Sequence, residues 1–299
     1  MNRFCRSLFL MVLVLPWMTG CASFDEWQRT KVYRPTPVDP AAWPAELAKY
    51  PGVAAQTLML PSGEQIQLLR FAGTGREGRT APVNVLYLHG TLRHALQNSQ
   101  KIEGITRNGL DVLAPDYRGW GASSYRVPDE ASLQDDAWAA WQEARKTPGP
   151  WVIFGHSMGS GLAVGLAQRI REAREQDQAS GGASDYCALV LESAFTSFDD
   201  VARSVGDFIG PIAAAVSSQK MASIDRIGLL HGPIWMLHGN RDATIPVALG
   251  KKLFAAAPSP KYWLDLPKDH SDLQTDTTGA YDAVWKQVKS SCQQTAAKP

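Results

Sequence analysis

Ser157 lies in a segment whose composition suits a sharp turn between a strand and a helix. Residues 151–161 read W-V-I-F-G-H-S-M-G-S-G, an apolar run followed by small residues. A strained turn of this kind accepts only small neighbours, which Gly155 and Gly159 provide. The Ser157 hydroxyl would then stand clear of the sheet, and the backbone N–H of Met158 would face an oxyanion at the start of the helix. The segment predicts a nucleophile, although the G-x-S-x-G pattern by itself also arises by chance.

A serine nucleophile needs a base and an acid, and both should follow predicted strands. In open α/β sheets the site is formed by loops at the carboxyl ends of the strands. His270 follows the last predicted strand and precedes the last predicted helix, while Asp242 comes five residues after an apolar run that ends at Leu237. The order Ser157, Asp242, His270 is one of the known chain orders of a Ser-Asp-His triad.

Each of these side chains would have a chemical task. His270 would take the Ser157 proton during attack and return it to the leaving group. Asp242 would hold the imidazole in the productive tautomer and stabilise the imidazolium. The developing oxyanion needs two donors, which we expect to be the backbone N–H groups of Met158 and Thr91.

Two further polar residues at strand ends are expected to be structural. His89 precedes Gly90 after an apolar strand, and such a pair commonly orders an oxyanion loop. Asp116 is an alternative acid, but Arg118 and Gly119 beside it favour a structural turn.

Strands and helices alternate along the chain from residue 82 onward. Near-continuous apolar runs predict strands covered on both faces, and periodic apolar positions predict helices between them. A hairpin over residues 56–60 and 64–71 precedes this region. The predicted strands cover residues 82–88, 110–114, 151–154, 188–191, 233–237 and 261–266, and the predicted helices cover residues 95–107, 131–146, 158–176, 247–257 and 281–290. This alternation predicts one mostly parallel sheet with helices on both faces.

The alternation pauses over residues 194–232. Apolar side chains recur there at three- and four-residue steps, which predicts one or two amphipathic helices. An insertion at this place would lie over the active-site edge, as a small lid or merely as packing. Phe195, Phe198 and Phe208 within it favour an apolar acyl group as the substrate.

The N-terminus has the features of an export signal. Arg3 and Arg6 precede an apolar stretch that ends just before Gly20 and Cys21. We expect residues 1–20 to be a lipoprotein signal peptide and Cys21 to be lipidated. The alternatives are a plain secretory signal and an uncleaved anchor. Residues 21–51 hold five prolines and predict an extended tether. Residues 52–299 would form the folded domain.

Cysteine usage fits an oxidising compartment. With Cys5 in the signal peptide and Cys21 acylated, Cys187 and Cys292 remain. We expect either a disulfide between them, at the sheet edge opposite the active site, or two small buried thiols.

Composition and charge exclude several classes of function. The formal net charge is +1, and loss of Arg3 and Arg6 with residues 1–20 would lower it to −1. No basic field for nucleic acid is therefore expected. The sequence has no H-E-x-x-H motif, no paired cysteines and no complete dinucleotide fingerprint, so we expect neither a metal nor another cofactor.

Six ordered motifs together resemble the α/β-hydrolase superfamily, and within it the Bem46-like and serine-aminopeptidase-like branch. The motifs are His89-Gly90, D-Y-R-G-W-G at residues 116–121, G-H-S-M-G at residues 155–159, L-E-S-A-F-T-S at residues 191–197, H-G-N-R-D at residues 238–242 with Ile245-Pro246, and Asp269-His270. The resemblance implies an eight-stranded sheet, a triad on Ser157, Asp242 and His270, and no cofactor. Relatives of this branch often have small or amide residues after His-Gly, whereas this chain continues with Thr91-Leu92-Arg93-His94.

These observations lead to one main functional hypothesis and two alternatives. The main hypothesis is a membrane-anchored serine hydrolase that faces the periplasm and cleaves an ester or related acyl bond in a small-molecule substrate. Ala22 after the lipidated Cys21 favours the outer membrane if the cell is Gram-negative. A peptidase or thioesterase would use the same triad. A non-catalytic envelope protein that binds a partner or lipid is the alternative from another class.

Overall fold

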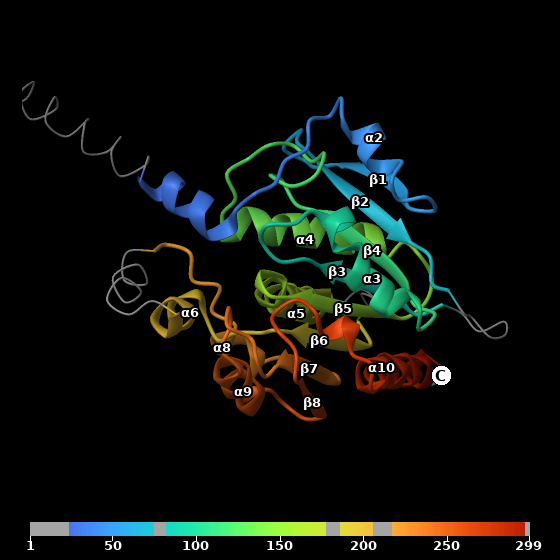
Figure 1. Ribbon diagram of the computed structural model, residues 1–299, viewed down its shortest axis with the longest axis vertical. Coiled ribbons are helices and arrows are strands. Elements are labelled where there is room, and N and C mark those ends of the chain that lie inside the picture. The colour runs from blue at the N-terminus through green and yellow to red at the C-terminus, as the bar shows by residue number, and fades with distance from the viewer. Residues whose placement is uncertain (1–23, 75–81, 178–185, 206–216, 297–299) are drawn as a thin grey trace, which may run out of the picture.

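An eight-stranded sheet forms the centre of the computed structural model, which describes residues 24–74, 82–177, 186–205 and 217–296 (Figure 1). The strand order is β1-β2-β4-β3-β5-β6-β7-β8. The strands are β1 (Ala54–Met59), β2 (Gln65–Phe71), β3 (Asn84–Leu88), β4 (Asp111–Asp116), β5 (Trp151–His156), β6 (Ala188–Glu192), β7 (Ile234–Gly239) and β8 (Lys261–Leu266).

The sheet is mostly parallel, as the sequence predicts. Only β2 runs against its neighbours, pairing antiparallel with β1 and with β4, and all other pairs are parallel. Every residue of the central strands β3, β5 and β6 is buried, because helices cover both faces. This arrangement confirms the predicted fold class.

The helices divide between the two faces of the sheet (Figure 1). On one face α4 (Glu130–Ala144) and α5 (Met158–Asp177) pack together, and α9 (Val247–Ala256) joins them over β7. On the other face α3 (Ser99–Thr106) packs against α10 (Ala280–Ala296). The shorter elements are α2 (Trp43–Leu47), η1 (Ala95–Asn98), α6 (Phe198–Val205), α8 (Ile224–Ile227) and η2 (Leu273–Thr275).

The segment expected to be an extended tether is instead folded onto the domain. Residues 24–33 are helical, and α2 follows. Tyr33 is fully buried, and its hydroxyl donates to Gln219 Oε1 at 2.8 Å. The predicted extended conformation is therefore wrong for residues 24–33 and for α2, because contacts with residues far along the chain offset the entropic cost of ordering this segment.

Parts of the remaining predictions fall outside the described residues. These include the proposed signal peptide, Cys21 and residues 206–216 of the proposed lid. The described part of that insertion contains α6 and the short α8, which packs against α5 and α9. Within the described ranges, no helix has both the length and the apolar character needed to cross a bilayer.

A disulfide joins the two remaining cysteines. Cys187 immediately precedes β6, Cys292 lies in α10, and their Cα atoms are 5.2 Å apart. The bond lies at the amino end of β6, whereas Ser157 follows the carboxyl end of the adjacent β5. The crosslink therefore stands at the end of the sheet opposite Ser157.

Candidate active site

Ser157 occupies a strained turn between β5 and α5. Its φ of +56° lies in the left-handed region, which side chains other than glycine rarely adopt. A Cβ atom on Gly155 would overlap the carbonyl oxygen of Gly159, and a Cβ on Gly159 would overlap that of Leu88 in β3. The two glycines are therefore required by the close approach of β3, β5 and α5.

Three side chains from distant parts of the chain meet at this turn. His270 Nε2 lies 2.8 Å from Ser157 Oγ, and His270 Nδ1 lies 2.7 Å from Asp242 Oδ2. Asp242 follows β7 and His270 follows β8, so both come from loops at the carboxyl ends of parallel strands. The arrangement has the geometry of a nucleophile, a base and an orienting carboxylate.

Asp242 is surrounded by hydrogen-bond donors. Its Oδ1 accepts from the backbone N–H groups of Thr244 and Ile245 at 2.9 and 2.7 Å. Burial raises the pKa of the Asp242 carboxyl, but hydrogen bonds from His238, His270 and the Ile245 backbone outweigh it and hold this pKa well below its usual value. The carboxyl is therefore ionised and able to orient an imidazole.

Two side chains hold the loop that carries His270 through hydrogen bonds to the His270 carbonyl oxygen. His156 Nε2 donates to the His270 carbonyl oxygen at 3.1 Å, and Ser193 Oγ donates to the same atom at 3.0 Å. Burial, together with the nearby Lys101 and His270, lowers the pKa of His156 well below its usual value. His156 is thus a neutral donor that holds the backbone at His270, a contact that the sequence did not predict.

A buried ion pair connects α3 with the end of β6. Lys101 Nζ in α3 contacts Glu192 Oε1 at the end of β6, and both side chains are almost fully buried. Lys101 also donates to Gln274 Oε1 at 2.9 Å, and Tyr281 OH donates to Glu192 Oε2 at 3.3 Å. Sequence reasoning missed this cluster, although a glutamate at the end of the apolar run A-L-V-L-E was a visible signal.

The two expected oxyanion donors lie near Ser157. Met158 is the first residue of α5, where backbone N–H groups have no acceptor within the helix. Thr91 lines the same pocket as Ser157, and a Cβ on the adjacent Gly90 would lie 3.1 Å from Ser157 Cβ. The positions suit the predicted roles, which stay predictions.

His89 and Asp116 are buried at the carboxyl ends of β3 and β4. His89 Nδ1 donates to the Gly90 carbonyl at 2.7 Å, which orders the loop before Thr91. Burial lowers the pKa of His89 to about 4. Asp116 Oδ1 accepts from the Ala95 backbone N–H at 2.6 Å. These contacts have the structural character that the sequence predicts for both residues.

Most residues that line the pocket beside Ser157 are of polar types. Its volume is about 650 Å³, and Ser157 and His270 both line it. Other lining residues include Arg34, Arg93, Gln97, Asn98, Lys101 and Gln274. Within the described part of the chain, neither Phe195 nor Phe198 lines the pocket, since Phe195 is buried and its ring stacks on Phe198 at 5.2 Å between centroids. The preference for an apolar acyl group that we inferred from these rings therefore loses its basis, and Phe208 lies outside the described residues.

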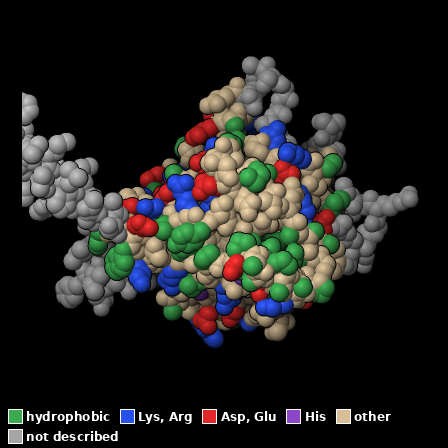
Figure 2. Space-filling model, turned by 90° about the horizontal axis from the view of Figure 1, so that it is seen from above, with side chains coloured by type: hydrophobic (Ala, Val, Ile, Leu, Met, Phe, Trp, Pro, Cys, Tyr) green, Lys and Arg blue, Asp and Glu red, His purple; other side chains and the backbone are tan. Residues whose placement is uncertain are grey.

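No arrangement for a metal ion is visible in the described ranges. Among those residues, no three or more His, Cys, Asp or Glu side chains are grouped so that they could hold one. Lys, Arg, Asp and Glu side chains are interspersed on the face shown in Figure 2, without a large field of one sign.

Sequence comparison connects residues 81–217 with a known family. They match the family described as serine aminopeptidase, S33. The lysophosphatidylserine lipase ABHD12 of Xenopus tropicalis is 34% identical over 210 residues, which cover 63% of this chain and 51% of that protein. An uncharacterized protein of Mycobacterium tuberculosis is 29% identical over 269 residues, covering 88% of this chain and 87% of the relative. The chain spans about half the length of the ABHD12 relatives that it matches.

Solved structures share the fold at low sequence identity. An α/β hydrolase from Vibrio vulnificus superposes with a TM-score of 0.67 at 20% identity, covering 87% of this chain and 91% of that one. An esterase from Pyrococcus furiosus gives 0.63 at 15% identity, covering 86% and 97%. Together with the sheet order and the turn at Ser157, these similarities show that the chain has the α/β-hydrolase fold.

Proposed function

We propose that this protein is a serine hydrolase that cleaves an ester or related acyl bond through an acyl-enzyme on Ser157. The observation that carries the proposal is the hydrogen-bonded chain from Asp242 through His270 to Ser157, at 2.7 and 2.8 Å. A non-catalytic binding protein has no need of this strained, ordered arrangement. Lipases and esterases among the similar proteins support the same reading.

The geometry allows both halves of the reaction. Ser157 Oγ attacks the substrate carbonyl carbon while its proton passes to His270 Nε2. Asp242 keeps the proton on Nδ1 and stabilises the imidazolium. The N–H groups of Met158 and Thr91 would bind the oxyanion. The imidazolium then protonates the leaving group, and a water molecule, deprotonated by the same imidazole, releases the acyl group.

The substrate class has two candidates. We favour a carboxylic ester, because relatives are named as a lysophosphatidylserine lipase and as esterases. A free-amine peptide is the second candidate. The matched family is described as an aminopeptidase, and Asp269 and Asp272 in the pocket lining could bind an α-ammonium group.

We further propose that the chain is anchored in the cell envelope through a lipid on Cys21, facing the periplasm, with the outer membrane favoured in a Gram-negative cell. The motif that ends at Gly20-Cys21 supports this. Several acyl chains on one residue would bind firmly, whereas a single chain binds only marginally. Mass spectrometry of the mature N-terminus tests the anchor, and an unmodified Cys21 would refute it.

Labelling with a fluorophosphonate probe tests the catalytic proposal. Wild-type protein should be labelled, and Ser157→Ala should lose labelling, because the probe needs an activated serine hydroxyl. Ser204→Ala, on the surface of α6, is the matched control and should label like wild type. Equal labelling of Ser157→Ala would place the nucleophile elsewhere, and no labelling of any variant would favour a binding protein.

A substrate series separates the two candidate classes. Acyl esters of increasing chain length and aminoacyl amides would be compared by kcat/KM with the wild-type protein. Faster turnover of the esters is expected. Faster turnover of aminoacyl amides would replace the esterase assignment with a peptidase.

A further inference from the structure

The helix over residues 24–33 exposes large aromatic side chains on one face. Phe24, Trp27 and Lys31 are spaced by three and four residues, so they share that face. Phe24 is 51% exposed and Trp27 58% exposed, and their rings stack at 5.8 Å between centroids. Lys31 is also exposed. Aromatic rings beside a basic side chain are typical of helices that lie in a membrane interface.

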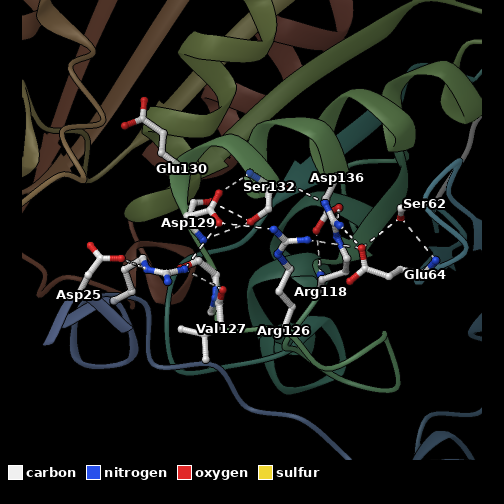
Figure 3. Close-up of polar contacts among 12 residues, drawn as sticks. Asp25, Ser62, Glu64, Arg118, Arg126, Val127, Asp129, Glu130, Ser132 and Asp136 are labelled. Atoms are coloured by element: carbon white, nitrogen blue, oxygen red, sulfur yellow. Dashed lines mark hydrogen bonds and ion pairs between the residues drawn. The ribbon is translucent and has the colours of Figure 1, made fainter. Parts of the chain in front are cut away.

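The opposite face of this helix is fixed to the domain (Figure 3). Arg29 Nε pairs with Asp25 Oδ2 at 2.8 Å, and Arg29 Nη1 donates to the Val127 carbonyl at 3.2 Å. Asp25 Oδ1 accepts from Ser218 Oγ at 3.0 Å. Together with buried Tyr33, these contacts prevent the helix from turning its aromatic rings inward. The outward direction of Phe24 and Trp27 is therefore set by the fold.

The exposed face continues to the mouth of the Ser157 pocket. Arg34, directly after the helix, is exposed and lines that pocket. Leu92, in the segment that follows β3, also lines this pocket and is 50% exposed. Arg34 thus connects the exposed helix to the lining of the pocket.

We propose that Phe24, Trp27, Lys31, Arg34 and Leu92 form a membrane-contact surface that holds the Ser157 pocket against a phospholipid bilayer. The proposal deepens the proposed function and rests on it, because it defines where a hydrolase of this kind takes up its substrate. Its acyl substrate is then one that resides in or at the bilayer.

Chain length and charge favour a bilayer as the occupant of this surface. Phe24 lies three residues after Cys21, a span of at most about 10 Å, so the proposed anchor would bring the rings to the lipid headgroups. Lys31 and Arg34 would attract anionic lipids. Three apolar side chains are too few for the core of a stable dimer interface, which argues against a second copy of this chain.

Quenching of tryptophan fluorescence by brominated lipids tests the contact directly. The full chain is added to vesicles of phosphatidylcholine and phosphatidylglycerol, with and without bromine on the acyl chains. The difference in emission between wild type and Trp27→Phe isolates Trp27 from the other nine tryptophans. We expect bromine to lower this difference by about half or more. An unchanged difference on vesicle-bound protein would overturn the proposal.

A second measurement links the contact to activity. The double variant Phe24→Glu/Trp27→Glu should hydrolyse a vesicle-borne ester about five-fold or more slowly, and a soluble short-chain ester at the wild-type rate. Leu229→Glu is the matched control. Leu229 is 48% exposed and precedes β7 at the opposite end of the sheet, so both rates should stay unchanged. Equal vesicle rates for wild type and the double variant would overturn the proposal.

The two proposals fail in different ways. If the serine hydrolase assignment is wrong, the soluble ester is not hydrolysed and the probe does not label Ser157, while Trp27 quenching still reports the contact. If only the membrane surface is wrong, soluble turnover persists and Trp27 is not quenched. Light scattering without vesicles tests self-association. If Trp27 is not quenched and the double variant has a smaller particle mass than wild type, the surface joins copies of this chain instead of contacting lipid.

Discussion

Two buried carboxyl groups show how immediate neighbours decide the charge of a residue. Asp242 has backbone N–H groups and His270 around it, and its pKa is held low. Asp116 has one donor, the Ala95 N–H, and within the described residues its Oδ2 has no hydrogen-bond partner. Burial therefore raises the pKa of Asp116 to about 7. The Asp242 carboxyl is therefore ionised, whereas the Asp116 carboxyl retains its proton until the pH approaches neutrality.

Asp116 predicts a pH dependence of stability. The folded pKa of about 7 lies above the ordinary value of 3.8, so the folded state retains a proton that the unfolded state releases. The contribution of Asp116 to the free energy of unfolding is fully present below about pH 4 and is lost as the pH rises towards 7. Asp116→Asn cannot titrate, so relative to wild type it should gain about 1–4 kcal/mol in free energy of unfolding between pH 4.5 and 7.5.

Denaturant titrations at pH 4.5, 6 and 7.5 measure this difference. Other titrating groups are common to both proteins and cancel in the comparison. A difference between wild type and Asp116→Asn that stays constant with pH would mean that Asp116 is ionised throughout.

At the scale of elements, the turn between β5 and α5 depends on the distance between packed backbones. The Gly159 backbone approaches the Leu88 carbonyl in β3 so closely that no Cβ atom fits. The same helix also contains Gly165, where an added Cβ would meet only the end of the Gln134 side chain. A flexible side chain can move aside, whereas a central strand cannot.

Gly159→Ala should therefore destabilise the protein by about 2 kcal/mol or more and abolish fluorophosphonate labelling, since the turn that presents Ser157 must shift. Gly165→Ala is the matched control on the same helix. It should retain labelling and change stability by no more than about 1 kcal/mol, because alanine favours a helix. Normal labelling of Gly159→Ala would show that the turn tolerates a side chain.

At the scale of the whole molecule, the two ends of the sheet have different tasks. The carboxyl ends of the strands carry Ser157, Asp242, His270 and the proposed membrane-contact surface. The disulfide Cys187–Cys292 crosslinks the amino end of β6 to α10, closing 105 residues of separation. The stabilising crosslink and the candidate active site thus lie at opposite ends of the strands.

Removal of this crosslink should affect stability without affecting chemistry. The double variant Cys187→Ser/Cys292→Ser should lose about 2–5 kcal/mol of unfolding free energy, because the unfolded chain gains freedom. Its kcat for a soluble ester should equal that of wild type. Thermal unfolding and ester hydrolysis of the same preparation measure both quantities. A lowered kcat with unchanged stability would contradict the separation of the two ends.

Much of the fold and the central part of the site follow from local sequence signals. Apolar runs located the parallel strands to within a few residues, and the spacing of glycines located the turn at Ser157. Asp242 and His270 could be selected because parallel strands deliver their carboxyl ends to one edge of the sheet. These inferences need only the residues next to each strand and the rule that parallel strands end at the same edge of the sheet.

Other features depend on pairs of residues that are distant in sequence. Lys101 meets Glu192 and Tyr33 meets Gln219 only after folding, so no local pattern predicts either contact. For the same reason, we expected an extended tether and an apolar acyl group as the substrate, whereas the helix over residues 24–33 is docked and mostly polar residues line the pocket. The sequence alone determined the strands, the turn and the choice of Ser157, Asp242 and His270. The tertiary structure alone decided what surrounds them, because burial and pairing are properties of the space between elements.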